Sequence, residues 1–260
     1  AEGYAEARAR EPRRSDRARH DLVRLIMSEH PADPDSVART ARSAGWTVPD
    51  SLTVIALQPL HDRRLGAELP PADQLGEQVL AGVDGDTPYL IVPDGETPLS
   101  DLCRMLPGHR LAAGPAVRIT DVRASLRVAR RALDLADRGV LPGDAMLDCA
   151  EHHTVLTLFA DDWLVDRLVQ RRLAPLDGLT ERQQDRMLVT LHEWLITRGQ
   201  VTEIGERLRV HPQTVRYRLK KLEELFGTQL SEPESRFELA LAVRAKLQRR
   251  RTEESTAAAG

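Results

Sequence analysis

The stretch VTEIGERLRVHPQTVRYRLKKL, residues 201–222, has the pattern of two short helices joined by a turn. Pro212 suits the first turn of the second helix, because proline has no backbone N–H and a helix leaves that group unused there. The second helix then repeats apolar residues at spacings of four and three, at Val215, Leu219 and Leu222. This spacing predicts a helix-turn-helix.

The first helix and the turn have their own pattern. Ile204 and Leu208 would point inward together, and Val210 would plug the turn. Gly205 follows Ile204, where we expect the second helix to pass too closely for a side chain to fit. Arg209 stands where many such motifs place a glycine.

The charge of this stretch differs from that of the whole chain. Residues 203–222 contain six arginines and lysines against two glutamates, whereas the 260 residues together have a net charge of −3. Affinity for nucleic acid would therefore come from local clustering and not from the protein as a whole. The major groove of DNA is wide enough to admit a helix, so we expect residues 212–222 to lie there.

Seven residues are candidates for DNA contact. His211, Gln213 and Thr214 would lead into the groove. Gln213 is suited to adenine edges and Arg216 to a two-pronged bond with guanine. The larger polar side chains farther along would hold phosphate oxygens and fix the register: Tyr217, Lys220 and Lys221.

Composition limits the alternatives. The chain is 41% hydrophobic but only 3% aromatic, which favours helical cores of Leu, Val and Ala. Cys103 and Cys149 lack metal or redox spacing, so we expect two unreactive thiols in the cytoplasm. No apolar run is long enough for a membrane span. We expect no metal site at His152 and His153, because adjacent helical residues point about 100° apart.

Strands and helices alternate in the middle of the chain. Residues 51–59, 87–96 and 110–119 are candidate strands, and 70–82, 98–105 and 121–139 candidate helices, the last capped by Thr120. The last helix of the chain would carry Phe237, Leu241 and Val243. We therefore expect an α+β chain, in which an α/β domain is followed by an all-α domain. The expected organisation is a helical segment or linker from a missing upstream domain (1–47), the α/β domain (48–150), a helical connector (151–179), the helix-turn-helix domain (180–250) and a disordered tail (251–260).

Two parts of the chain resemble known domains. VHPQTVRYRLKKLEELFG and LSEPESRFELALAVR resemble the C-terminal helix-turn-helix domain of the PucR-type transcriptional regulators. SLTVIALQP and LAAGPAVRITDVRASLRVARRALDLA resemble the GGDEF-like domain that precedes it in these proteins. The resemblance implies transcriptional control through double-stranded DNA by a homodimer, with RNA polymerase as a further candidate partner.

Two other functions compete with this one. A nucleotide-binding protein of cyclase descent would need a Gly-Gly turn beside acidic residues, but here Gly85-Asp86 is followed by Thr87-Pro88. We therefore expect no catalysis and no cofactor, and for the R-x-x-D of Arg118–Asp121 a role in helix capping. The other alternative is a module that contacts the transcription machinery through the same basic helix.

We also expect a dimer surface on the middle domain or the N-terminal helix. It would use apolar residues of the N-terminal helix together with the helices of residues 163–176: Leu22, Val23, Leu25 and Ile26.

Overall fold

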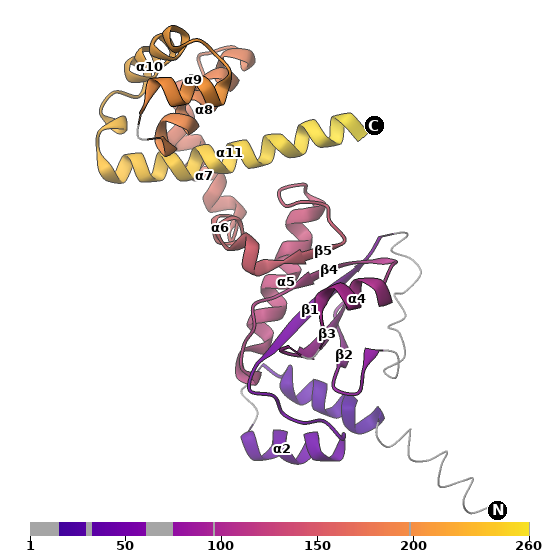
Figure 1. Cartoon of the computed structure of the whole chain (residues 1–260). Helices are drawn as coiled ribbons and strands as arrows, with labels where there is room; N and C mark the ends of the chain where they lie inside the picture. The colour runs from indigo at the N-terminus through magenta and orange to yellow at the C-terminus, as the bar shows by residue number, and fades with distance from the viewer. Residues whose placement is uncertain (1–15, 30–32, 61–74, 96, 198, 260) are drawn as a thin grey trace, which may run out of the picture. The chain divides into compact units, whose positions relative to one another are not determined.

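The computed structural model describes residues 16–29, 33–60, 75–95, 97–197 and 199–259, with side chains up to residue 250. The chain forms two compact units, residues 1–156 and residues 157–260 (Figure 1). No helix of the described ranges is both long and apolar enough to cross a membrane. The α+β fold class is confirmed, since an α/β unit is followed by a helical one.

The first unit is built on a five-stranded sheet with strand order β2-β3-β1-β4-β5. The strands are β1 (Leu52–Pro59), β2 (Leu80–Asp84), β3 (Thr87–Pro93), β4 (His109–Ala113) and β5 (Met146–Asp148). The central strand β1 is antiparallel to β3 and β4, and β5 is parallel to β4. The run of β-branched and apolar residues in β1 suits a strand covered on both faces.

Helices cover both faces of this sheet (Figure 1). Helix α4 (Leu99–Met105) contributes Leu102 to a cluster with Ile55 and Leu57 of β1, and Leu106, which follows the helix, joins the same cluster. On the other face lies α5 (Val122–Asp137). Its inward positions repeat at helical spacing and are all buried: Val122, Leu126, Ala129, Leu133 and Ala136. Two short 3-10 turns complete this part, η1 (Ile119–Asp121) and η2 (Cys149–His152).

A glycine sets how closely α5 approaches the sheet. A side chain at Gly114 would place its Cβ 2.4 Å from the backbone oxygen and the Oγ of Ser125. Ser125 Oγ donates to the carbonyl of Pro115 (2.8 Å) and accepts from the N–H of Val54 (3.3 Å). Strand β4 therefore ends at Ala113, earlier than the predicted end at residue 119, because the chain here bonds to α5 as well as to β1.

The segment expected to be a linker packs against the sheet. Residues 16–26 are helical and bury Leu22, Val23 and Ile26, and α2 (Pro34–Ser43) follows, capped by the side chain of Asp33. Trp46 Nε1 donates to the carbonyl of Gln78 (2.7 Å). The expected boundary at residue 47 therefore does not separate two bodies, because the apolar side chains before it complete the same core. Residues 1–15 lie outside the described part.

Three other local predictions need correction. Residues 80–82 belong to strand β2, where a helix over 70–82 was expected; residues 70–74 lie outside the described part. Thr120 does not cap α5: the helix starts one residue later, with Asp121 at the N-cap. Asp121 makes no side-chain capping bond either, and its carboxylate instead accepts from the hydroxyl of Thr120 (3.0 Å).

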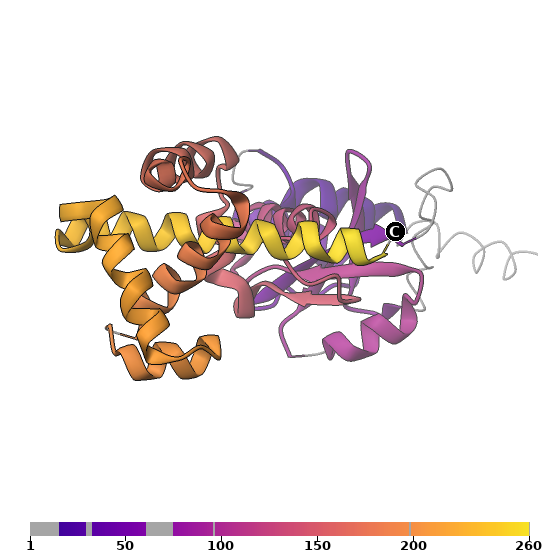
Figure 2. The ribbon, with the colours of Figure 1, turned by 90° about the horizontal axis from the view of Figure 1, so that it is seen from above.

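The second unit is entirely helical. Its elements are α7 (Asp162–Leu173), η3 (Ala174–Leu176), α8 (Glu181–Ile196), α9 (Val201–Leu208), α10 (Pro212–Phe226), η4 (Gly227–Leu230) and α11 (Pro233–Ala259); the short α6 (His153–Leu158) precedes them. Figure 2 shows α11 as one unbroken helix. The core gathers apolar residues from four of these helices and the turns between them: Leu173, Leu176, Met187, Leu188, Leu191, Leu222, Phe226, Leu230, Leu239, Ala242 and Val243.

The expected connector contributes to this core. Arg172 Nε donates to a carboxylate oxygen of Glu238 (2.6 Å), which joins α7 to α11. This hydrogen bond lowers the pKa of Glu238. Leu173 and Leu176 are buried beside it, so residues 162–176 are part of the helical unit.

Helix α11 also differs from expectation. It continues to Ala259, past residue 250, where we predicted disorder. Extending an existing helix costs no new nucleation, and the terminal alanines favour it. Phe237 is 60% exposed and does not join the core, whereas Leu239 and Ala242 do.

Candidate nucleic-acid interface

The turn between α9 and α10 is held by backbone contacts. The N–H of Val210 donates to the carbonyl of Gly205 (2.9 Å). A Cβ at Gly205 would lie 2.9 Å from the carbonyl oxygen of Val210 and 3.7 Å from Val215 Cγ2. The close approach expected at Gly205 is thus present, but it is the backbone of the turn that comes closest, ahead of the side chains of the second helix.

Arg209 supplies the bend of this turn. Its φ of 52° is left-handed, and no other non-glycine residue of the described chain has a positive φ. Left-handed backbone is unfavourable for a residue with a Cβ. Arg209 therefore adopts the conformation for which glycine is preferred, which explains why glycine is common at this position in related turns.

The inner face of α10 is fixed by the core. Val215, Leu222 and Phe226 are buried, and Leu219 packs against the same cluster half-buried. The helix meets α8 and α9 along this face. Because successive residues of a helix turn by about 100°, burying these positions determines which side chains point away from the domain.

The predicted contact residues lie on the opposite face. Six of them are exposed: His211, Gln213, Thr214, Arg216, Tyr217 and Lys220. Tyr217 has 67% of its surface exposed, which is high for an aromatic side chain that could have packed inside. Lys221 is half-buried and lies nearer the edge of this face. We call the six exposed residues and Lys221 the outer face of α10.

Two of these residues have tasks that sequence did not reveal. His211 is the N-cap of α10, and its Nδ1 accepts from the N–H of Gln213 (3.2 Å). That ring nitrogen is used inside the protein, so only the other one faces outward for a partner. Arg216 donates to Oε1 of Gln213 (3.3 Å), which orients both side chains on the exposed surface.

Not every basic residue of the motif has a positive charge that is free to bind a partner. Arg207 is bound to Glu203 (2.8 Å) and lies 3.5 Å from Glu193, so it does not add to the exposed positive surface. The other basic residues of the motif form no ion pair with a carboxylate of the described residues: Arg209, Arg216, Arg218, Lys220 and Lys221.

Arg218 was not among the predicted contact residues. It is half-buried, and its guanidinium donates to the hydroxyl of Thr190 on α8 (3.3 Å). Burial, and then the nearby charge of Arg186, lower the pKa of Arg218. Arg218 follows the buried Val215 by three residues, and this spacing indicates that it lies at the border between the inner and outer faces of α10. Arg186 is exposed beside it, and only the packing of α8 against α10 could have revealed this pair.

Other predicted features can now be placed. Cys103 and Cys149 are free thiols, and burial raises the pKa of Cys149 to about 12. No group of metal-binding side chains occurs in the described ranges. The prediction that Leu22, Val23 and Ile26 form a dimer surface is wrong, because these side chains are buried within the first unit. Leu25 is half-buried.

The fold and this site define a helix-turn-helix protein with a preceding α/β domain. Residues 187–245 match the family model of the PucR C-terminal helix-turn-helix domain, and residues 28–135 match that of the GGDEF-like domain. The chain thus pairs a GGDEF-like domain with a helix-turn-helix domain of the PucR type, and the resemblance stated from the sequence is confirmed.

Two individual proteins are also similar. The chain is 46% identical over 71 residues to the purine catabolism regulatory protein of Bacillus subtilis (strain 168), a match that covers 26% of this chain and 13% of the relative. A solved structure, the regulator of polyketide synthase expression from Bifidobacterium adolescentis, is 21% identical with a TM-score of 0.44, and the match covers 89% of this chain and 93% of that one.

Proposed function

We propose that this chain is part of a transcriptional regulator that binds a specific sequence of double-stranded DNA through α10. The observation that carries the proposal is the division of α10 into two faces. Its apolar side is buried in the helical core, and its polar side exposes Gln213, Arg216 and Lys220. A helix anchored on one side with basic groups on the other matches the width and charge of the major groove.

Each residue of the outer face has a role in this proposal. Gln213 and Arg216 would read base edges near the N-terminal end of the helix, where helix-turn-helix proteins make such contacts. Tyr217, Lys220 and Lys221 would bind phosphates and fix the register. Thr214 would contact the backbone or a base edge nearby. His211 would cap α10 through Nδ1, and its other ring nitrogen, Nε2, would bind DNA.

The turn supports this arrangement. Arg209 is exposed at the bend that precedes α10, and its charge is not balanced by a carboxylate of the described chain. It would bind a phosphate beside the groove. The relative from Bacillus subtilis is named as a regulatory protein. A regulator that acts by binding DNA agrees with both that name and the exposed basic helix of this chain.

We further propose that the protein acts as a homodimer. Helix-turn-helix proteins that dimerise place two recognition helices about one turn of DNA apart, so the operator would be palindromic. A regulatory role also fits the hairpin of β2 and β3, where Asp84 and Thr87 flank Gly85-Asp86 without the second glycine of an active cyclase. RNA polymerase is a candidate partner of the DNA-bound protein.

The experiment is selection from random duplexes, followed by affinity measurement on the selected sequence. We expect enrichment of a palindrome, with binding that weakens steeply as salt rises while the sequence preference persists. Binding without sequence preference would contradict the specific reading of DNA. A lack of duplex binding, together with retention of RNA polymerase, would favour the protein-interaction module instead.

A further inference from the structure

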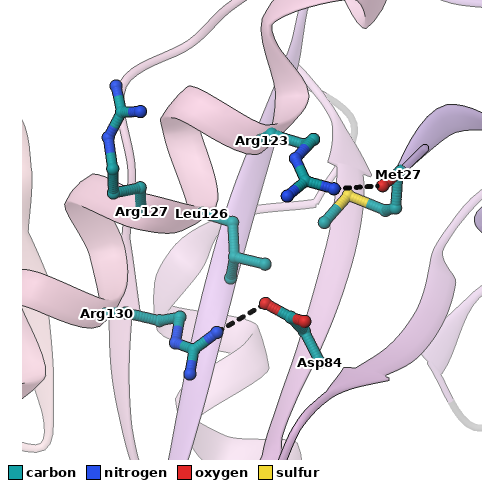
Figure 3. Close-up of a pocket in the computed structure, with 6 residues that line it drawn as sticks. All are labelled: Met27, Asp84, Arg123, Leu126, Arg127 and Arg130. Atoms are coloured by element: carbon teal, nitrogen blue, oxygen red, sulfur yellow. Dashed lines mark hydrogen bonds and ion pairs between the residues drawn. The ribbon is translucent and has the colours of Figure 1, made fainter. Parts of the chain in front are cut away.

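Three arginines of α5 share one face and border a pocket in the first unit (Figure 3). Arg123, Arg127 and Arg130 follow one another at spacings of four and three, which places them along about 10 Å of one side of the helix. The pocket has a volume of about 290 Å³. Its lining comes from α5, the segment after the N-terminal helix and the end of β2: Met27, Asp84, Arg123, Leu126, Arg127 and Arg130.

The three arginines are held differently. Arg123 donates to the backbone carbonyl of Met27 (2.7 Å), and Arg130 forms an ion pair with Asp84 (2.5 Å) (Figure 3). Arg127 is exposed and has neither a hydrogen bond nor an ion pair with a described residue. The carbonyl of Met27 carries no full charge, so only one of the three guanidinium charges is balanced by a carboxylate.

A second pocket adjoins the first. Its volume is about 220 Å³, and it shares Met27, Asp84 and Arg123 with its neighbour. It adds Arg24 and His20 from the N-terminal helix, with Val23 and Tyr89 as its less polar part. Among the described residues that line the two pockets, four are arginines and one is a carboxylate, Asp84. The paired pockets are therefore concave, strongly basic and partly apolar.

We propose that these pockets bind a small phosphorylated molecule, with its phosphate at Arg127 and Arg130 and its less polar part against Leu126 and Met27. Guanidinium groups bind phosphate oxygens in pairs of parallel hydrogen bonds. Arg127 can do so without first breaking an ion pair, whereas Arg130 would share its guanidinium with Asp84. Both volumes lie just below the usual range of ligand pockets, about 300–1,000 Å³, which suits a ligand of small size.

A small ligand fits the site better than a duplex does. Arg123 and Arg130 reach from α5 toward the segment at Met27 and the end of β2, so they border a hollow, whereas a phosphate backbone is contacted by side chains on an open surface (Figure 3). The exposed side chain of Arg127 extends away from them in this structure and would turn toward the hollow to meet a ligand (Figure 3). A DNA backbone would also make no contact with the apolar side of the hollow. The site is separate from α10, so the inference does not depend on the function proposed for that helix.

The test uses the full chain and two probes, inorganic phosphate and phenyl phosphate, in calorimetric titrations at constant ionic strength. We expect saturable binding of both, with phenyl phosphate bound more tightly because its ring covers apolar surface. Arg127→Gln should weaken binding about tenfold, as expected when one charged hydrogen-bond donor is lost. Asp84→Asn should strengthen it severalfold, because Arg130 loses its competing carboxylate.

The matched control is Arg104→Gln on α4. It makes the same change of charge at a side chain that is 78% exposed and does not line either pocket, so binding should be unaffected. Equal weakening by both substitutions would show a general charge effect and overturn the proposal, as would a lack of saturation in the unmodified protein. Displacement of phenyl phosphate by duplex DNA, with duplex binding weakened by Arg127→Gln, would make this surface a DNA contact and also overturn it.

Discussion

The guanidinium of Arg216 donates a hydrogen bond to Oε1 of Gln213, one turn earlier on α10 and 3.3 Å away. Both side chains are exposed, and both were predicted to read base edges. The bond limits the conformations of each, so neither has to be ordered alone when a partner binds. It also couples them energetically, because removing one changes the freedom of the other.

The first prediction concerns this pair. Arg216→Ala should reduce affinity for the selected duplex by about 1–3 kcal/mol and relax the preference at one base pair. Gln213→Ala should relax a neighbouring position, and the double variant should lose less than the two single losses combined. Fluorescence anisotropy on the selected duplex and its single-base variants measures this. Arg207→Gln is the control, since Arg207 is bound to Glu203, and unchanged preferences in Arg216→Ala would remove the assignment.

A second prediction separates phosphate contacts from base contacts. Lys220→Gln should weaken binding to all duplexes by a similar factor, because a phosphate carries no sequence information. The slope of log affinity against log salt should decrease in magnitude by about one unit. Salt titrations of the variant and the unmodified protein, on specific and random duplexes, give both quantities. A loss confined to the specific duplex would instead make Lys220 a base contact.

A third prediction tests the turn. Gly205→Ala should destabilise the helical unit by about 1–3 kcal/mol, because its Cβ would meet the carbonyl oxygen of Val210. Gly178→Ala is the matched control: its Cβ would meet no atom within 4 Å. Thermal unfolding followed by circular dichroism compares the two. If both variants unfold at the same temperature as the original protein, the close approach at Gly205 does not exist in solution.

The strained residue of the turn supplies a fourth prediction. Arg209→Gly should increase stability by about 0.5–1 kcal/mol, because relief of the left-handed conformation exceeds the added flexibility of the unfolded chain. Denaturant unfolding at low salt measures the change. Arg209→Ala removes the same charge but keeps a Cβ, so it separates backbone strain from electrostatics. Equal stability of the alanine and glycine variants would show that strain is absent.

A fifth prediction uses the pH dependence of stability. Burial, and then the charge of Asp84, raise the pKa of Tyr89 from 10.0 to about 12. The neutral form is therefore favoured in the folded protein, while the unfolded chain ionises from about pH 10. The contribution of Tyr89 to stability is complete below pH 10 and decreases as pH rises towards 12. Tyr89→Phe should lose less stability over this interval, and identical pH profiles would contradict the burial of the hydroxyl.

Much of the helix-turn-helix could be predicted from the sequence because it is local. The spacing of Val215, Leu219 and Leu222, the proline after the turn and the cluster of basic residues lie within 22 positions. Helical periodicity alone then assigns an inner and an outer face. Placing Arg207 and Arg218 required more, since their partners Glu193 and Thr190 belong to another helix.

The pocket on α5 could not be predicted in this way. Arg123, Arg127 and Arg130 occur in a sequence that reads as an ordinary solvated helix face. Asp84 is 46 positions before Arg130 and Met27 is 96 positions before Arg123, and only the sheet and the packed N-terminal helix bring them together. The same packing buries Leu22, Val23 and Ile26, which the sequence pattern made available for a dimer.

The sequence by itself determined the order of the two domains, the helix-turn-helix and the face of α10 that carries the basic residues, because these follow from short-range periodicity, caps and turn residues. Tertiary structure alone decided that residues 16–29 and 33–46 pack on the α/β core, that residues 162–176 belong to the helical unit, and that four arginines line two pockets that share one aspartate. Burial depends on which distant segments pack together, and no local pattern contains that information.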